Sequence, residues 1–359
     1  MTDMPTITSV TPRAVNVPLE RPLRTASGAL ESAPLLLIDV ATDAGITGRA
    51  YVMGYTAATL APMRAFLENI APMCTGQPVA PADRAAGFEA AFRLMGRQGL
   101  VGMALSGLDM ALWDALGQAH GVPVVELLGA EPRPVIAYDS YGIVDMPQDS
   151  GMLEASLARG FQGIKIKLGD GDVARDVETV RAVRNVIGDD VALMVDYNQS
   201  LTALAAVRRI EHLADFDLHW VEEPVPAEDF EGHAEVRAAS PVPIQTGENW
   251  WFASDMAKAI AAGACDYAMP DLMKIGGVTG WLAAAGLAAS VRMPVSSHLF
   301  IEASAHVLPV TPTAHWLEYL DMASTVLENP STVVDGHVTA QGPGLGMRWN
   351  EDAVKRYLL

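Results

Sequence analysis

The chain has 359 residues, half of them apolar, which is enough to bury a large core and to form about two domains. Its 43 acidic residues outnumber its 24 basic residues, so the formal net charge is −19 at pH 7. This composition excludes an intrinsically disordered protein, and the negative charge argues against nucleic acid or an anionic membrane as a partner because both would repel it.

Residues 1–125 predict an α+β domain. Strand-like segments at 8–19 and 33–42 precede helix-like segments near 57–70, 81–95 and 103–119. The first ten residues contain neither a basic cluster nor an apolar signal region, and no uninterrupted apolar run approaches the roughly 20 residues of a membrane span. We therefore expect a cytoplasmic protein without a membrane segment, whose two cysteines, Cys74 and Cys265, are buried and reduced.

From about residue 135, short apolar segments alternate with alanine-rich helical segments. Eight strand candidates follow one another every 21 to 29 residues: VIAYDS, GIKIK, VALMVD, LHWVE, PIQTGE, DYAMPD, PVSSH and HWLE. This rhythm predicts eight parallel strands with helical crossovers that close into a barrel, and an open doubly wound sheet is the alternative. After Asp321 the pattern returns to strands and turns. The predicted organisation is an α+β domain at 1–125, a barrel at 126–322 and a tail at 323–359 that packs on the first domain.

Every predicted barrel strand ends in at least one polar or ionisable side chain. In chain order these are Ser140, Lys165 and Lys167, Asp196 and Asn198, Glu222, Glu248, Asp271, His298 and Glu318. Each one alone has a structural explanation, such as a turn, a solvated end or a buried histidine. Together they favour a catalytic site, because chemistry gathers at the carboxyl ends of barrel strands and unpaired buried charge costs several kcal/mol per group.

The segment GIKIKLG (163–169) alternates two isoleucines with two lysines. Side chains alternate across a strand, so Ile164 and Ile166 share one face while Lys165 and Lys167 share the other. An isolated pattern of this kind is typical of an edge strand with a solvated face. In a barrel whose helices cover the isoleucines, both lysines project into the barrel mouth instead.

Three carboxylates, Asp196, Glu222 and Glu248, end consecutive strands and lie 26 residues apart in each step. Neighbouring carboxylates repel one another unless a divalent cation lies between them, and three oxygen ligands with open positions suit Mg²⁺. A salt-bridge network with lysine or arginine is the alternative, although few cations are available beyond Lys165, Lys167 and Lys274.

Several motifs, in this order and spacing, resemble the mandelate racemase subgroup of the enolase superfamily. They are RAVNVPLERPLRTASG, AYDSYG, GIKIKLG, VDYNQS, WVEEP, TGENW, PDLMKIGGVTG, SSHLF and HWLEYLD. The resemblance implies a (β/α)₇β modified TIM barrel with an α+β capping domain built from the N-terminal region and the C-terminal tail. It also implies that Asp196, Glu222 and Glu248 bind Mg²⁺, and that the protein is a homo-oligomer, such as an octamer.

The resemblance further implies the roles of the polar strand ends. Lys167 and His298 would be the two acid/base catalysts, with Asp271 orienting His298. Glu318 would donate a hydrogen bond to the substrate carboxylate, while Lys165, Asn198 and Ser140 would hold the charged substrate. Removing a proton α to a carboxylate creates a dianionic enolate, which Mg²⁺ and Lys165 stabilise. Lys167 can take that proton only as a neutral amine, and the neighbouring lysine and the cation predict a lowered pKa for it.

Two bases on opposite faces suit racemisation of a 2-hydroxy acid such as mandelate, whereas the same groups can serve an acid-sugar dehydratase. The capping loop that the resemblance assigns to specificity contains Arg24, Thr25 and Ser27. The predicted pocket residues are mostly apolar and favour an aromatic or alkyl substrate and hence a racemase: Leu23, Ala26, Leu30, Met53, Tyr55, Leu299 and Leu320. A Schiff-base aldolase and a non-catalytic binding barrel are the remaining alternatives. GGVTG at 276–280 predicts a turn before a helix, with a phosphate cradle as the weaker hypothesis.

Overall fold

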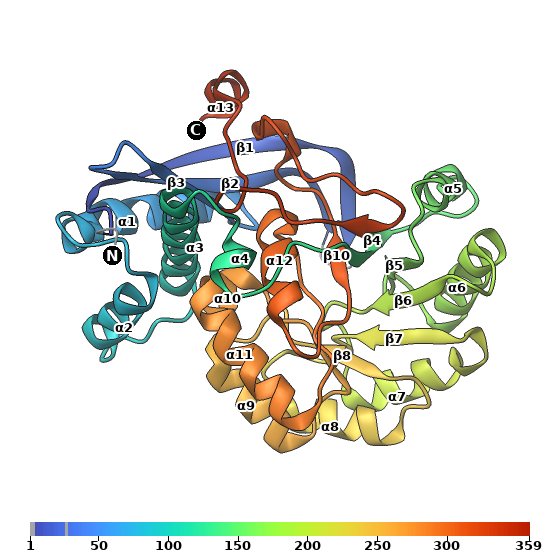
Figure 1. Ribbon diagram of the computed structural model, residues 1–359. Helices are drawn as coiled ribbons and strands as arrows, with labels where there is room; N and C mark the ends of the chain where they lie inside the picture. Colours follow the sequence, from blue (N-terminus) through green and yellow to red (C-terminus); the bar gives the residue numbers. More distant parts are fainter. Residues whose placement is uncertain (1–3, 26–27) are drawn as a thin grey trace.

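The computed structural model describes residues 4–25 and 28–359 (Figure 1). The N-terminal part is an antiparallel sheet in the order β1-β2-β3, covered by helices. Its elements are β1 (Ile7–Thr25), β2 (Gly28–Thr42), β3 (Thr47–Met53), α1 (Leu60–Cys74), α2 (Pro81–Phe92) and α3 (Leu100–His120). The two predicted strands and three predicted helices are present, whereas β3 was not predicted. Ala26 and Ser27 of the predicted pocket lie outside the described residues.

Helix α3 is the central helix of this part. By length and composition it could cross a membrane, but 72% of its most apolar window is buried inside the protein. It packs against β3 on one side and against the barrel helices α10 (Leu272–Ile275) and α11 (Gly277–Val291) on the other. A helix that is apolar all round is expected where both sides are covered by protein. One apolar core therefore runs from the N-terminal sheet into the barrel.

The second part is a ring of parallel strands in the order β10-β4-β5-β6-β7-β8-β9. The strands are β4 (Val135–Ile143), β5 (Gly163–Lys167), β6 (Ala192–Asp196), β7 (Leu218–Glu222), β8 (Ile244–Thr246), β9 (Tyr267–Ala268) and β10 (Leu317–Tyr319). The strand predicted near residue 296 is present only as isolated bridges, from Val295 to Ala268 and to Ala314 and from His298 to Asp271. Because this segment lies between β9 and β10, and β10 pairs with β4, the ring closes and the open sheet is excluded.

Helices surround the ring on its outer side (Figure 1). They are α5 (Ser150–Ala158), α6 (Val173–Ile187), α7 (Ala203–Glu211), α8 (Phe230–Ala239), α9 (Phe252–Ala262), α10, α11 and α12 (Ile301–Val307), while α4 (Val124–Leu127) precedes the first strand. Ile164 and Ile166 pack in the apolar layer between β5 and these helices. Lys165 and Lys167 consequently point into the ring, where they are 1% and 7% exposed. The edge-strand interpretation is wrong, because β5 pairs on both sides.

The C-terminal tail returns to the N-terminal sheet. Strand β11 (His337–Val338) pairs with β4, and α13 (Glu351–Tyr357) packs on β1. Glu351 accepts a 2.7 Å hydrogen bond from Arg13, and Leu358 forms a bridge with Val15 on the outer edge of β1. Helix α13 was not predicted. The tail therefore completes the capping part of the fold, while the domain boundaries stay predictions.

Candidate active site

Three buried carboxylates end neighbouring strands of the ring. Asp196 and Glu222 are register partners at the ends of β6 and β7, and Glu248 follows β8. One oxygen from each lies within 4.8 Å of the others. The backbone just beyond these strands is strained, with positive φ angles of 44° at Asn198 and 35° at Glu223. Sharp turns of this kind aim the carboxylates at one point.

The charges around this point do not balance. Six carboxyl groups are buried here (Asp196, Glu222, Glu223, Glu248, Asp271 and Glu318), against four groups that can be cationic (Lys165, Lys167, Lys274 and His298). Burial and the charges of Glu248 and Asp196 raise the pKa of Glu223 well above its ordinary value. Burial also raises the pKa of Glu222 to about 7, although Lys165 opposes the effect. A divalent cation supplies the two missing positive charges, so the residues fit Mg²⁺.

Both lysines of β5 contact these carboxylates. Lys165 Nζ lies 2.5 Å from Glu222 and 2.7 Å from Glu318, and Lys167 Nζ lies 2.5 Å from Asp196. Burial lowers the pKa of Lys167, but Asp196 and Glu248 together outweigh burial and raise it above its ordinary value. Asp196 serves as the counter-ion of Lys167, and a cation on Asp196 would compete for the same oxygens. The prediction of a lowered pKa for Lys167 includes the charge of that cation and stays a prediction.

His298 faces the same carboxylates from the segment between β9 and β10. Its Nδ1 atom lies 2.6 Å from Asp271 Oδ2, and its Nε2 atom lies 3.2 Å from Glu248. Asp271 also accepts a 2.6 Å hydrogen bond from the backbone N–H of Met273 and so caps α10. Burial lowers the pKa of His298, but Glu248, Glu318 and Asp271 outweigh burial and raise it to about 9. These carboxylates therefore favour the protonated imidazole.

Glu318 is a buried carboxylate that faces Lys165 and His298. Burial favours its neutral form, yet Lys165 and His298 outweigh burial and lower its pKa to about 2. It accepts a 2.9 Å hydrogen bond from the backbone N–H of Leu299. An ionised carboxylate only accepts hydrogen bonds, so the predicted hydrogen bond from Glu318 to the substrate carboxylate requires a proton on Glu318, and that role stays a prediction.

A cavity of about 440 Å³ opens above these groups, between the barrel mouth and the β1–β2 hairpin. The predicted residues that line it are Leu23, Thr25, Leu30, Met53, Tyr55, Lys167, Asn198, Glu248, His298, Leu299, Glu318 and Leu320. The polar groups lie at the carboxylate end, and apolar residues from the hairpin and β3 form much of the opposite wall. Such a cavity suits a small molecule with one charged end and one apolar end.

Two predicted substrate contacts lie elsewhere or act differently. Ser140 is the register partner of Lys165, is buried, and does not line the cavity; its Oγ has no hydrogen-bond partner among the described residues. Asn198 donates from its backbone and side chain to Asp196, at 2.7 and 2.9 Å, and so orients that carboxylate. In the structure Asn198 therefore holds a predicted metal ligand in place and also lines the cavity, and its contact with the substrate stays a prediction.

Sequence reasoning missed several residues of the cavity wall. They are Gly28, Ala29, Gln199, Asn249 and Met322. Asn249 donates to Glu223 at 2.8 Å and accepts a 2.5 Å hydrogen bond from Lys274 Nζ. Lys274 therefore supports the loop after β8 rather than facing the cavity. The signal was available, because Asn249 directly follows Glu248 in the same strand-end motif.

GGVTG does not form a turn before the helix as predicted: Gly276 caps α11, and residues 277–280 form its first turn. The carboxylate of Asp109, on α3, accepts hydrogen bonds from the backbone N–H and the hydroxyl of Thr279, at 3.0 and 2.6 Å. A Cβ at Gly277 would collide with that carboxylate. Because a protein carboxylate already fills the start of the helix, the phosphate-cradle hypothesis fails.

The protein is a closed barrel with a capping sheet, and buried ionisable side chains surround a site for a divalent cation. These features define a metal-dependent barrel enzyme. Residues 7–129 match the family model "Mandelate racemase / muconate lactonizing enzyme, N-terminal domain", and residues 151–353 match "Enolase C-terminal domain-like". The chain belongs to this family of the enolase superfamily, and it is a magnesium-dependent enzyme.

Three relatives illustrate the range of the family. An enolase from Bradyrhizobium, solved with magnesium and mandelic acid, is 55% identical over 100% of both chains with a TM-score of 0.98. The L-talarate/galactarate dehydratase of Salmonella typhimurium is 34% identical over 263 residues, 72% of this chain and 66% of that one. The D-galactarolactone cycloisomerase of Agrobacterium fabrum is 31% identical over an alignment that covers 98% of each chain.

Proposed function

We propose that the protein racemises a 2-hydroxy acid with an apolar or aromatic substituent, such as mandelate, by two-base proton transfer. The observation that carries the proposal is that Lys167 and His298 line one cavity from separate parts of the ring. Lys167 ends the second strand, whereas His298 belongs to the seventh segment, between β9 and β10. A substrate α-carbon held between them presents one face to each side chain.

The residues divide the chemistry as follows. Asp196, Glu222 and Glu248 would hold Mg²⁺, which would supply positive charge to stabilise the enolate. Lys167, as a neutral amine, takes the α-proton from one face, and protonated His298 delivers a proton to the other face. Asp271 holds the imidazole through Nδ1, which leaves Nε2 directed at the cavity. In the reverse direction the two side chains exchange roles, so each turnover leaves the total number of protons unchanged.

The cavity supports a substrate that is charged at one end and apolar at the other. Leu23, Leu30 and Met53 leave few partners for a polyhydroxylated chain. The Bradyrhizobium relative, which binds mandelic acid, also supports this choice. An acid-sugar dehydratase is the second candidate, because Gln199 and Asn249 add amide groups to the cavity wall and the Salmonella relative is a dehydratase.

The test is α-proton exchange in D₂O with enantiopure mandelate, enantiopure lactate and the meso compound galactarate, each with and without EDTA. The proposal predicts exchange and racemisation of mandelate that EDTA abolishes, and slower turnover of galactarate. Dehydration of galactarate without exchange on mandelate would replace the racemase with the second candidate. Borohydride trapping with substrate distinguishes a Schiff-base aldolase, because only an imine is reduced to a stable adduct. The homo-oligomeric state stays a prediction, which light scattering tests.

A further inference from the structure

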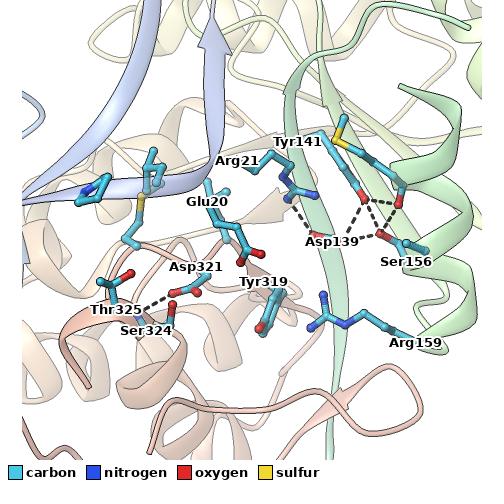
Figure 2. Close-up of a pocket in the computed structure, with 16 residues that line it drawn as sticks. Glu20, Arg21, Asp139, Tyr141, Ser156, Arg159, Tyr319, Asp321, Ser324 and Thr325 are labelled. Carbon is cyan, nitrogen blue, oxygen red and sulfur yellow. Dashed lines mark hydrogen bonds and ion pairs between the residues drawn. The ribbon is translucent and has the colours of Figure 1, made fainter. Parts of the chain in front are cut away.

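A second cavity, of about 370 Å³, is lined by residues of β1, β4 and α5 and by the segment that follows β10 (Figure 2). Leu320 and Met322 line both cavities and therefore separate them. The charged side chains of the second cavity are Glu20, Arg21, Asp139, Arg159 and Asp321. Because its carboxylates outnumber its guanidinium groups, this cavity is a poor site for an anion. Its buried interactions point to a mechanical role instead.

Arg21 crosses from the capping sheet to the barrel at this cavity (Figure 2). Its Nη2 atom donates to Asp139 Oδ1 at 3.2 Å and to the carbonyl oxygen of Ser140 at 2.9 Å. The guanidinium carbon lies 3.8 Å from the centre of the Tyr141 ring. Arg21 can reach β4 because residues 19–22 of β1 face only Glu31 of β2, so this part of β1 bulges out of the ladder.

Asp139 is a buried carboxylate whose charge is balanced by Arg21. It is 2% exposed, and it accepts hydrogen bonds from Tyr141 and from Ser156, at 3.2 and 2.5 Å. Both of those donors are neutral, and Arg21 forms the one ion pair to Asp139 in the described part of the chain. A buried carboxylate that loses its cation becomes strongly unfavourable. The pair therefore fixes Arg21 to the first barrel strand.

The hairpin tip follows directly after this anchor. Leu23 and Leu30, which are paired across the hairpin, line the substrate cavity. The backbone of Arg24 lies against Gly142, where any Cβ would collide with it. The second ion pair of the tip, Arg24 with Asp149 at 2.8 Å, is about half exposed on the arginine side and holds weakly. The hairpin thus depends on Arg21 for its position over the substrate.

We infer that Arg21 is a positioning residue: by pairing with Asp139, it locks the β1–β2 hairpin over the substrate cavity and thereby sets discrimination for the apolar part of the substrate. The inferred effect on substrates rests on the proposed function. The inferred effect on the hairpin does not, and it can be measured without any substrate.

The first measurement is tryptic cleavage after Arg24. Trypsin does not cut the Arg21–Pro22 bond, so all variants share this cleavage site. Arg21→Met keeps the aliphatic stem but loses the charge, and cleavage after Arg24 should become about tenfold faster because local opening of the hairpin exposes the bond. Arg21→Lys should restore part of the protection, because its ammonium still reaches a carboxylate but lacks the planar fork. Arg159→Met is the matched control: it removes a cation from the same cavity that forms no ion pair with the described residues.

The second measurement compares mandelate with lactate, whose methyl group is too small to need the hairpin. Arg21→Met should lower the ratio of kcat/KM for mandelate to that for lactate by about tenfold, mainly through KM. Arg159→Met should leave both the ratio and the cleavage rate unchanged. Should Arg21→Met fail to fold, Arg21→Lys provides the same two readouts.

The outcomes distinguish the inferred lock on the hairpin from the proposed racemase function. Unchanged cleavage after Arg24 in folded Arg21→Met overturns the lock, whatever the reaction is. Faster cleavage with equal losses on mandelate and lactate overturns its role in discrimination. Faster cleavage in an enzyme that turns over neither acid supports the lock and rejects the proposed substrate.

Discussion

Replacing His298 with asparagine separates the two proposed bases. Asparagine keeps a nitrogen near the place of Nδ1, where it can still donate to Asp271, at present 2.6 Å from the ring. It has no atom at the place of Nε2, which faces the cavity and lies 3.2 Å from Glu248. The variant therefore keeps the hydrogen bond to Asp271 but removes Nε2, the nitrogen that transfers a proton. Lys167, held by Asp196 on the other side, keeps its contacts.

The expected loss is large for one reaction and small for the other. Removing a positioned acid or base lowers a rate by about 10²- to 10⁴-fold, which corresponds to roughly 3 to 5 kcal/mol of activation free energy. Racemisation of mandelate should fall by that factor in both directions. Exchange of the α-proton of the enantiomer that faces Lys167 should stay within about tenfold of the wild type, because the enolate still forms on that side.

The assay follows deuterium incorporation by proton NMR and optical rotation in the same D₂O sample. His120→Asn, on the exposed end of α3, is the matched control and should behave as the wild type. Full racemisation by His298→Asn would refute the two-base reasoning. Loss of exchange on both enantiomers, with substrate and Mg²⁺ still bound, would refute it equally.

Three further predictions concern the metal, the pocket and the fold. Glu222→Gln removes one anionic ligand and should weaken Mg²⁺ binding in calorimetry, and unchanged affinity would remove Glu222 from the metal site. Met53→Phe should change relative kcat/KM among aryl and alkyl 2-hydroxy acids without changing Mg²⁺ affinity, and an unchanged ranking would contradict the proposed pocket. Burial raises the pKa of Asp109 from 3.8 to about 7 despite its bonds from Thr279, so this carboxyl stabilises the fold most at low pH and loses that contribution as pH rises to about 7. Asp109→Asn should reduce the loss of stability between pH 5 and pH 8 by about 2–3 kcal/mol, visible as a few degrees in melting temperature, and an unchanged pH dependence would contradict the raised pKa.

The sequence was most informative for polar residues that lie at the ends of the repeated barrel strands. Asp196 and Glu222 could be placed together because consecutive strands of a parallel barrel are neighbours, and the structure has them as register partners. The lysines of β5 could be placed inside the ring because their alternation with Ile164 and Ile166 leaves one face for the helices. Both inferences needed only the strand period and the order of the strands.

Protonation and long-range contacts could not be read in the same way. The ion pair between Lys165 and Glu318 requires β10 to close beside β4, and the pKa of Lys167 depends on the sum of several buried charges. The segment at Val295 forms isolated bridges to Ala268 and Ala314 instead of the full strand that was predicted. Helix α13 did carry a signal, since Asn350 caps it and two acidic residues follow in its first turn.

The contact between the tail and β1 links folding to the order of synthesis. Strand β1 lies at the edge of the capping sheet, and the chain end covers it: Leu358 bridges Val15, and Leu359 donates to the Ala14 carbonyl oxygen at 2.9 Å. Arg13 and its partner Glu351 are 338 residues apart, so this edge leaves the ribosome long before its cover exists. An uncovered edge strand readily pairs with other chains, so the nascent protein is more prone to aggregate until residues 351–359 are made.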